Sequence, residues 1–149
     1  MRIPRLLLLP LLLCLAGCPP RMMDVGVSGA IDRVQFSISL PRNLFEFTVK
    51  PADIYEIEVR DWTALAARPR ENGQPQPEIW RVHAETCQRA LTRVRYGETP
   101  AGFTVQTNAL ALREGGSYMV GVRSCHYLHD YGIATFRIRH GRAVESVWD

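Results

Sequence analysis

The chain has 149 residues, with 18 Lys and Arg, 15 Asp and Glu, four Cys, a formal charge of +3 and 46% hydrophobic residues. This length suits one domain with a single core. A charged fraction of 22%, with aromatic residues spread along the chain, argues against intrinsic disorder and against a polyanion-binding tail.

The chain opens with the pattern of a secretory signal. Its first five residues carry Arg2 and Arg5, and residues 6–13 form an apolar run, broken by Pro10, that is too short to span a bilayer. We expect residues 1–17 to be a signal peptide that is removed. Without its two arginines, 16 basic residues stand against 15 acidic ones. The mature chain is then nearly neutral, which argues against nucleic acid as a partner.

Leu15-Ala16-Gly17-Cys18 resembles the lipobox of bacterial lipoproteins, with small residues before the cysteine and Leu before them. The resemblance implies cleavage before Cys18, a diacylglycerol thioether on its sulfur and an acyl chain on its amino group, which together anchor a protein stably in the bilayer. Pro19 stands where Asp would favour the inner membrane, so we expect an outer-membrane anchor facing the periplasm. An ordinary secretory signal cleaved nearby is the alternative. We expect residues 18–24 to form a lipidated tether and residues 25–149 the folded domain.

Two cysteines remain once the signal and the anchor are set aside. Cys14 leaves with the signal and Cys18 carries the lipid, so Cys87 and Cys125 are left in an oxidising compartment, where we expect a disulfide. They lack the C-x-x-C spacing of redox or metal-binding pairs. Closing a loop of about 39 residues would stabilise the fold by roughly 4 kcal/mol in the chain-entropy model.

The rest of the chain shows the two-residue alternation of half-buried strands rather than a helical period. The alternating runs cover residues 34–40, 45–49, 55–60, 78–84, 90–96, 118–123, 132–139 and 143–148. Between them, residues 65–77 carry three Pro and one Gly and are expected to form a long exposed connection. Short strands, closely spaced turns and no long helix predict an all-β fold, an immunoglobulin-like antiparallel β-sandwich of seven to eight strands.

A corner motif precedes the run at 118–123. A Leu stands six residues before a Tyr that begins an alternating strand, in the segment Leu112-Arg-Glu-Gly-Gly-Ser-Tyr118-Met-Val-Gly-Val122. This arrangement resembles the corner of fibronectin type III and related domains. The resemblance implies that the Tyr118 hydroxyl bonds back to the corner backbone. The alternative is a plain glycine turn, and Tyr118 is structural in both cases.

The sequence contains few candidate catalytic or metal-binding residues. His126, His129 and Asp130 could share a metal ion, but they fall in a predicted loop between strands, where we expect an aromatic-rich, solvent-facing segment instead. Glu56 and Glu58 share the polar face of a strand, where solvated carboxylates are more usual than a catalytic pair. No nucleophile motif or phosphate-binding loop is present in the sequence. We therefore expect neither an enzyme nor a cofactor.

Several pieces together resemble a family of small bacterial lipoproteins described as periplasmic immunity factors of type VI secretion systems. They are the lipobox, Val34-Gln-Phe36-Ser-Ile38, Glu78-Ile-Trp80, Tyr96-Gly-Glu-Thr-Pro-Ala-Gly-Phe103 and the corner motif. The resemblance implies a membrane-anchored protein that neutralises a toxin delivered into the periplasm, and it brings no catalytic residues. An edge strand or the end loops would make the contact, and the loops 64–77 and 125–131 are the candidate binding surfaces.

Two alternatives to toxin binding remain open at this stage. One is a structural or assembly lipoprotein of the cell envelope, whose partner would be an envelope component. The other is a metal-binding accessory protein centred on His126 and His129.

Overall fold

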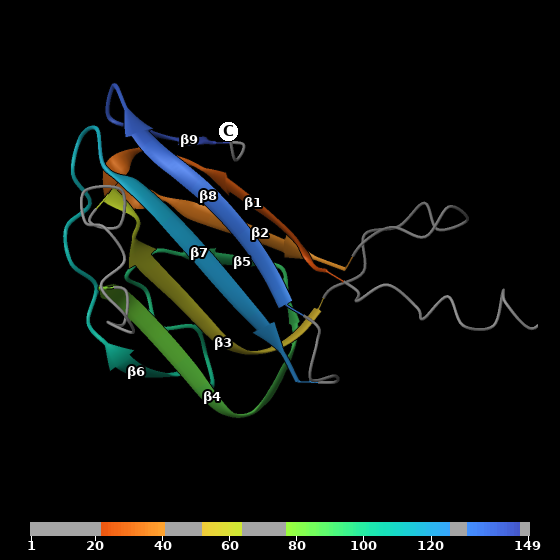
Figure 1. Ribbon diagram of the computed structural model, residues 1–149. Coiled ribbons are helices and arrows are strands. Elements are labelled where there is room, and N and C mark those ends of the chain that lie inside the picture. Colours follow the sequence, from red (N-terminus) through yellow and green to blue (C-terminus); the bar gives the residue numbers. More distant parts are fainter. Residues whose placement is uncertain (1–21, 41–51, 64–76, 126–130, 147–149) are drawn as a thin grey trace, which may run out of the picture.

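The structure is a computed structural model that describes residues 22–40, 52–63, 77–125 and 131–146. Nine strands make up most of this part of the chain, together with a three-residue 3₁₀ turn, η2 (Ile31–Arg33). The strands are β1 (Asp24–Ser28), β2 (Gln35–Ser39), β3 (Ala52–Asp61), β4 (Glu78–Leu91), β5 (Arg93–Arg95), β6 (Thr104–Thr107), β7 (Ser117–Ser124), β8 (Tyr131–Arg139) and β9 (Arg142–Glu145) (Figure 1).

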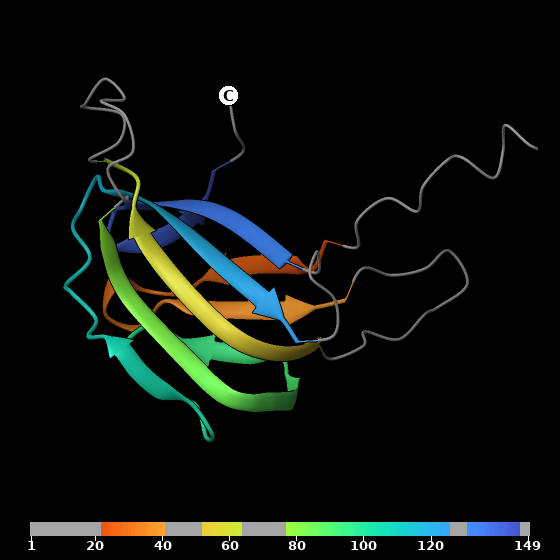
Figure 2. The same cartoon turned by 60° about the horizontal axis from the view of Figure 1, so that its bottom comes forward.

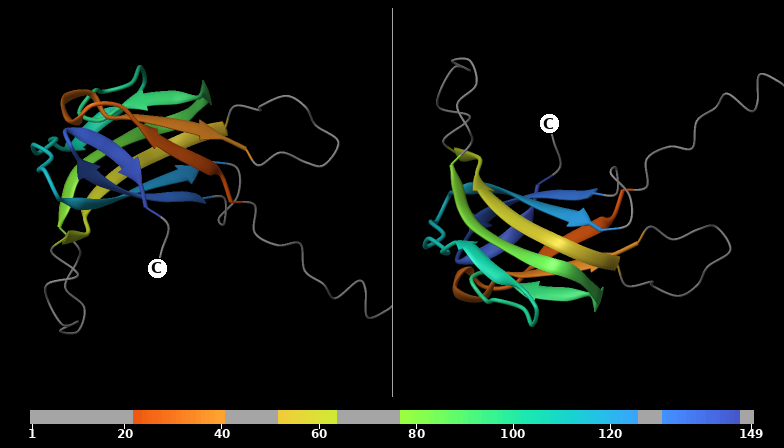
Figure 3. Two further views of the ribbon diagram at one scale, coloured as in Figure 1. Left: turned by 90° about the horizontal axis from the view of Figure 1, so that it is seen from above. Right: turned by 90° about the horizontal axis from the view of Figure 1, so that it is seen from below.

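The strands form two antiparallel sheets that pack face to face (Figures 2 and 3). One sheet has the order β1-β2-β5 and the other the order β6-β4-β3-β7-β8-β9. The all-β sandwich predicted from the alternation is confirmed. If β1, β2, β3, β5, β7 and β8 are equated with strands A, B, C, E, F and G, the neighbours A-B-E and C-F-G of the immunoglobulin fold are all present.

The described strands differ in part from the predicted runs. Residues 78–84 and 90–96 were expected as separate strands, but β4 continues to Leu91 and the chain then enters β5 in the other sheet. Strands β1 and β6 were not predicted, because β1 contains Gly26 and β6 has no buried face to produce alternation. The predicted run at 45–49 lies outside the described residues.

The core lies between the two sheets. Trp80 on β4, Phe36 on β2 and Phe136 on β8 are at most 1% exposed. The Phe36 ring lies 6.3 Å from that of Trp80 and 5.9 Å from that of Phe136, measured between centroids. These aromatic contacts join the two sheets, and rings of this size supply a large part of the apolar area buried on folding.

The described fold begins before the predicted domain boundary. Strand β1 starts at Asp24, Met23 is 3% exposed in the core, and the Met23 N–H donates to the Tyr131 carbonyl at 2.9 Å. Residues 22–24, which were assigned to a tether, therefore belong to the sandwich. No helix in the described part of the chain has the length and apolar character needed to cross a bilayer.

The corner motif forms the expected hydrogen bond. Tyr118 is 1% exposed, and its hydroxyl accepts a hydrogen bond of 2.8 Å from the Arg113 N–H. Gly116 makes room for the ring, since a Cβ there would stand 2.4 Å from the Tyr118 hydroxyl oxygen. The prediction that the Tyr118 hydroxyl bonds back to the backbone of the corner before β7 is confirmed.

Candidate binding site

The candidate site lies on the outer face of the six-stranded sheet, away from the core. Along β3, Ile57 and Val59 point into the core, so the alternation places Glu56 and Glu58 on the outer face. Glu56 is nevertheless only 2% exposed and Glu58 only 8%. The expectation of solvated carboxylates at these two positions was wrong.

The strand register places arginine and histidine side chains around Glu56. Glu56 is paired with His83 on β4 and with Arg123 on β7, and Glu58 is paired with Arg81. These residues share the outer face because paired positions of neighbouring strands point to the same side. Two adjacent strands thus bring cationic groups over one carboxylate.

Arg81 makes the closest contacts with Glu56. Its Nη2 and Nε donate to Glu56 Oε2 at 2.5 and 3.0 Å. This hydrogen bonding raises the pKa of the Arg81 guanidinium above its ordinary value, so Arg81 remains charged. His83 Nδ1 lies 3.6 Å from the same Oε2.

The second oxygen of Glu56 is less well satisfied. Arg123 Nε lies 3.3 Å from Oε1, but no described residue donates a hydrogen bond to that oxygen. An acceptor buried without a donor is costly, so it must be balanced by the surrounding positive charge. The Arg81 and Arg123 side chains are 36% and 52% exposed, which lets both guanidinium groups also face solvent or a partner.

Glu58 forms a separate ion pair with Arg60 of the same strand. Arg60 Nη2 donates to Glu58 Oε2 at 2.7 Å. A Cβ on Gly121 would stand 3.2 Å from Glu58 Cγ, so the glycine on β7 lets the Glu58 side chain lie flat against the sheet. The missing side chain also leaves a depression in the outer face of β7.

A groove of about 890 Å³ opens above this depression. Its lining comes from β3, β4, β7 and β8 and includes Tyr55, His83, Met119, Arg123, Tyr131 and Ile133. The Tyr55 and His83 rings meet edge to face at 5.7 Å, while Tyr131 and Ile133 are 39% and 41% exposed. The groove thus combines exposed apolar and aromatic side chains with a half-exposed arginine.

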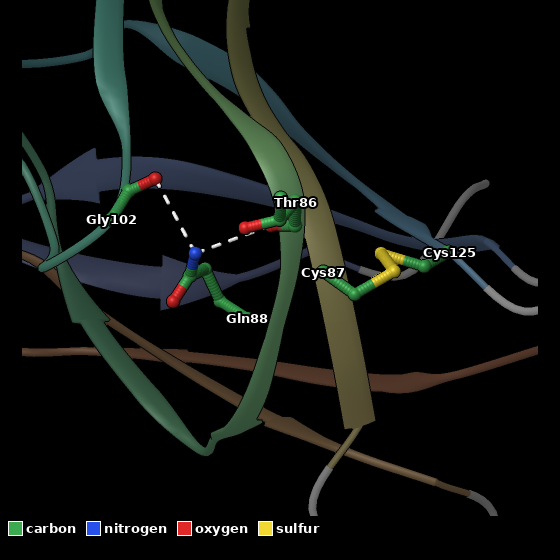
Figure 4. Close-up of a disulfide and its surroundings, with 5 residues drawn as sticks. All are labelled: Thr86, Cys87, Gln88, Gly102 and Cys125. Carbon is green, nitrogen blue, oxygen red and sulfur yellow. Dashed lines mark hydrogen bonds between the residues drawn. A yellow bond between two sulfur atoms is a disulfide. The ribbon is translucent and has the colours of Figure 1, made fainter.

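A disulfide forms part of the groove lining. Cys87 on β4 and Cys125, directly after β7, are bonded, with their Cα atoms 5.7 Å apart (Figure 4). The predicted pairing is confirmed, and both cysteines line the groove. The Cys125 N–H also donates to the Asp53 carbonyl at 3.2 Å. The bond therefore links the two strands that flank β3 and fixes the position of the groove walls.

Beside the disulfide, β4 is connected to the loop before β6. The Gln88 amide nitrogen donates to the Thr86 carbonyl at 3.2 Å and approaches the Gly102 carbonyl at 3.5 Å (Figure 4). Gly102 has a positive φ of 81°, and a Cβ there would overlap the Gln88 amide. A glycine is required at this position for both reasons.

Most site residues proposed from the sequence fall outside the described part of the chain. This applies to Cys18, to His126, His129 and Asp130, and to residues 64–76 of the first candidate loop. Within residues 22–40, 52–63, 77–125 and 131–146, no group of three or more His, Cys, Asp or Glu is placed to hold a metal ion.

Sequence analysis did not find the group formed by Glu56 with Arg81, His83 and Arg123, which we call the Glu56 cluster. Only the register of β3 against β4 and β7 shows that Arg81 and Arg123 contact the same carboxylate. A weak signal was present in the two glutamates that alternate with apolar residues in the same strand that also carries Arg60.

Comparison of the chain with protein-family models, with curated proteins and with solved structures finds no match.

Proposed function

We propose that this protein is a membrane-anchored periplasmic lipoprotein that binds and neutralises a protein toxin delivered by a type VI secretion system. The single observation that carries the binding role is the groove on the outer sheet face, with Tyr55, Met119, Arg123 and Ile133 in its lining. Tyr, Met and Arg are enriched where proteins bind one another, and aromatic and Arg side chains dominate the binding energy.

The rigidity of the groove supports the same role. Glu56 and the disulfide hold the outward side chains of β3, β4 and β7 in place before any partner arrives. Binding to a surface that is already ordered loses less side-chain entropy, which favours high affinity. A toxin inhibitor needs such affinity because it must keep a toxin bound that is present at low concentration.

The cellular location rests on the sequence, and the disulfide supports it. Disulfides persist in oxidising compartments such as the bacterial periplasm. The lipobox at Cys18 supplies the anchor to the bilayer, and an anchored inhibitor stands where a delivered toxin would act.

The proposal is tested by coexpressing the full chain, with its own signal, with the product of an adjacent toxin-like gene. Recovery from the membrane fraction in detergent reports the anchor, and calorimetry reports the affinity. Replacing Ile133 by Asp places a charge in the groove and should weaken binding about 30-fold or more.

Val144→Asp is the matched control, since Val144 is 47% exposed on β9 and does not line the groove. It should change the affinity less than about threefold. Absence of binding by the wild-type protein, or equal loss in both variants, would overturn the proposal.

A further inference from the structure

The edges of the two sheets differ in how they are protected from pairing with another chain. Among the described strands, β1 and β5 end one sheet and β6 and β9 end the other. An edge strand exposes unpaired N–H and C=O groups, and natural proteins protect such edges with charges or by covering them.

Strands β1 and β9 protect each other. The Val27 N–H on β1 donates to Glu145 Oε1 on β9 at 2.5 Å. The Ala143 N–H donates to the Gly29 carbonyl at 3.0 Å, and the Ile31 N–H donates to the Gly141 carbonyl at 2.8 Å. These bonds join the two sheets along one side of the sandwich and occupy edge groups of both strands. The third edge, β5, carries two exposed charges, Arg93 and Arg95.

Strand β6 carries no charge, and no strand in the described part of the chain pairs with its outer side. Its short length and a register shift opposite β4, between Val105 and Thr107, are its remaining protection. It pairs only with β4 among the described strands and lies at the margin of the sheet (Figures 1 and 2). Residues 99–112 contain no charged side chain, and Thr104, Val105 and Gln106 are exposed. The Leu110 N–H donates to the Ile79 carbonyl of β4, so the open edge continues past Thr107 to Leu110.

Two apolar side chains accompany this edge. Val105 is 43% exposed and Leu110 is 58% exposed. We propose that the β6 edge pairs antiparallel with β6 of a second copy of this chain, so that the two six-stranded sheets continue into one another across a two-fold axis.

The charge pattern favours a second copy as the occupant. Two-fold antiparallel pairing brings two copies of the same short strand together. A strand whose charges all have one sign therefore places like charges close to one another. On β5 this would oppose Arg93 and Arg95 with arginines. On β6 it opposes only Thr, Val and Gln, which pair well across strands. Since each copy contributes the same edge and the other edges are protected, assembly stops at the dimer.

The dimer is expected to be weak. The edge between Thr104 and Leu110 is short, and a stable interface usually buries about 800 Å² on each partner. Association should therefore depend on concentration. Sedimentation velocity of the full chain, in density-matched detergent, should show a monomer–dimer equilibrium that shifts toward dimer as protein is added.

Val105→Lys introduces the same positive charge on the short edge strand of both copies and removes apolar contact, so it should raise the dissociation constant about tenfold or more. Val144→Lys is the control, because Val144 is equally exposed on the protected edge of β9, and it should leave the constant within about twofold. Both sites are exposed, and circular dichroism confirms folding. A monomer at every concentration, oligomers beyond the dimer, or equal effects of the two variants would each overturn the proposal.

Discussion

The two faces of β3 are both buried, but by different chemistry. On the inner face Ile54, Ile57 and Val59 are fully enclosed by apolar side chains of the two sheets. On the outer face Glu56 and Glu58 are covered by the arginines of β3, β4 and β7. One strand thus contributes to an apolar core and to an ionic layer.

This difference indicates which face of β3 contributes more to the free energy of unfolding. Apolar burial stabilises by about 25 cal/mol for each Å² removed from water. Burying a carboxylate costs several kcal/mol in desolvation. The favourable electrostatic interaction with its arginine partners is often no larger than this cost. The outer layer is therefore expected to contribute little net stability as a whole, although removing one partner is costly because it leaves the other charges uncompensated. The role that we propose for it is to order the groove above it. Substitutions on the two faces should separate these roles.

The largest effect is expected on the inner face. Trp80→Ala removes a ring that is 1% exposed and that packs against Phe36 and Tyr96, with the Tyr96 centroid at 5.4 Å. The free energy of unfolding should fall by about 3–5 kcal/mol, because a cavity adds to the lost transfer energy. Urea denaturation measures this loss. A decrease below about 1 kcal/mol would mean that the ring is not central to the core.

A smaller effect is expected on the outer face. Glu56→Gln keeps the shape of the side chain but removes its charge. Arg123 then loses the carboxylate that lies 3.3 Å from its Nε, and among the described residues Arg81 keeps only the longer contact of 3.6 Å with Glu78. The free energy of unfolding should fall by about 1–3 kcal/mol, less than for a fully buried pair because both arginines are partly exposed.

Glu85→Gln is the control for this change, since Glu85 is exposed on the same face of β4. It should alter the free energy of unfolding by less than about 0.5 kcal/mol in the same urea experiment. If the two variants behave alike, the Glu56 cluster has no structural role and the ordering assigned to it is wrong.

Sequence patterns predicted the inner face well. The alternation of Val34, Phe36 and Ile38 and the placing of Trp80 and Val82 on one face match their burial. Local rules suffice here because a strand with one apolar face has only one way to pack. The disulfide followed from counting cysteines, and the Tyr118 bond was implied by the resemblance of residues 112–122 to the corner of fibronectin type III domains.

The outer face could not be predicted in the same way. A glutamate opposite an apolar face looks identical in sequence whether it is solvated or covered. The difference depends on Arg81 and Arg123, which are 25 and 67 positions away along the chain and reach Glu56 only through the order β4-β3-β7. Non-local register of this kind is not encoded in a short sequence pattern.

The smallest effect concerns a polar group at the margin of the inner face. The half-buried Tyr96 hydroxyl donates to the Leu110 carbonyl at 2.6 Å. Tyr96→Phe keeps the ring against Trp80 but leaves that carbonyl without its donor. The free energy of unfolding at neutral pH should fall by about 1 kcal/mol, the usual net value of one hydrogen bond.

The same substitution tests a pH dependence. Burial raises the pKa of the Tyr96 phenol above its ordinary value, so the folded protein favours the neutral form. This contribution is complete below the unfolded pKa of about 10 and is lost as the pH rises above it. Wild type should therefore lose stability above about pH 10, and the gap between wild type and Tyr96→Phe should narrow there. Urea titrations at neutral pH and above pH 10 measure the gap, and a gap that stays constant would show that the Tyr96 phenol ionises as readily in the folded protein as in the unfolded chain.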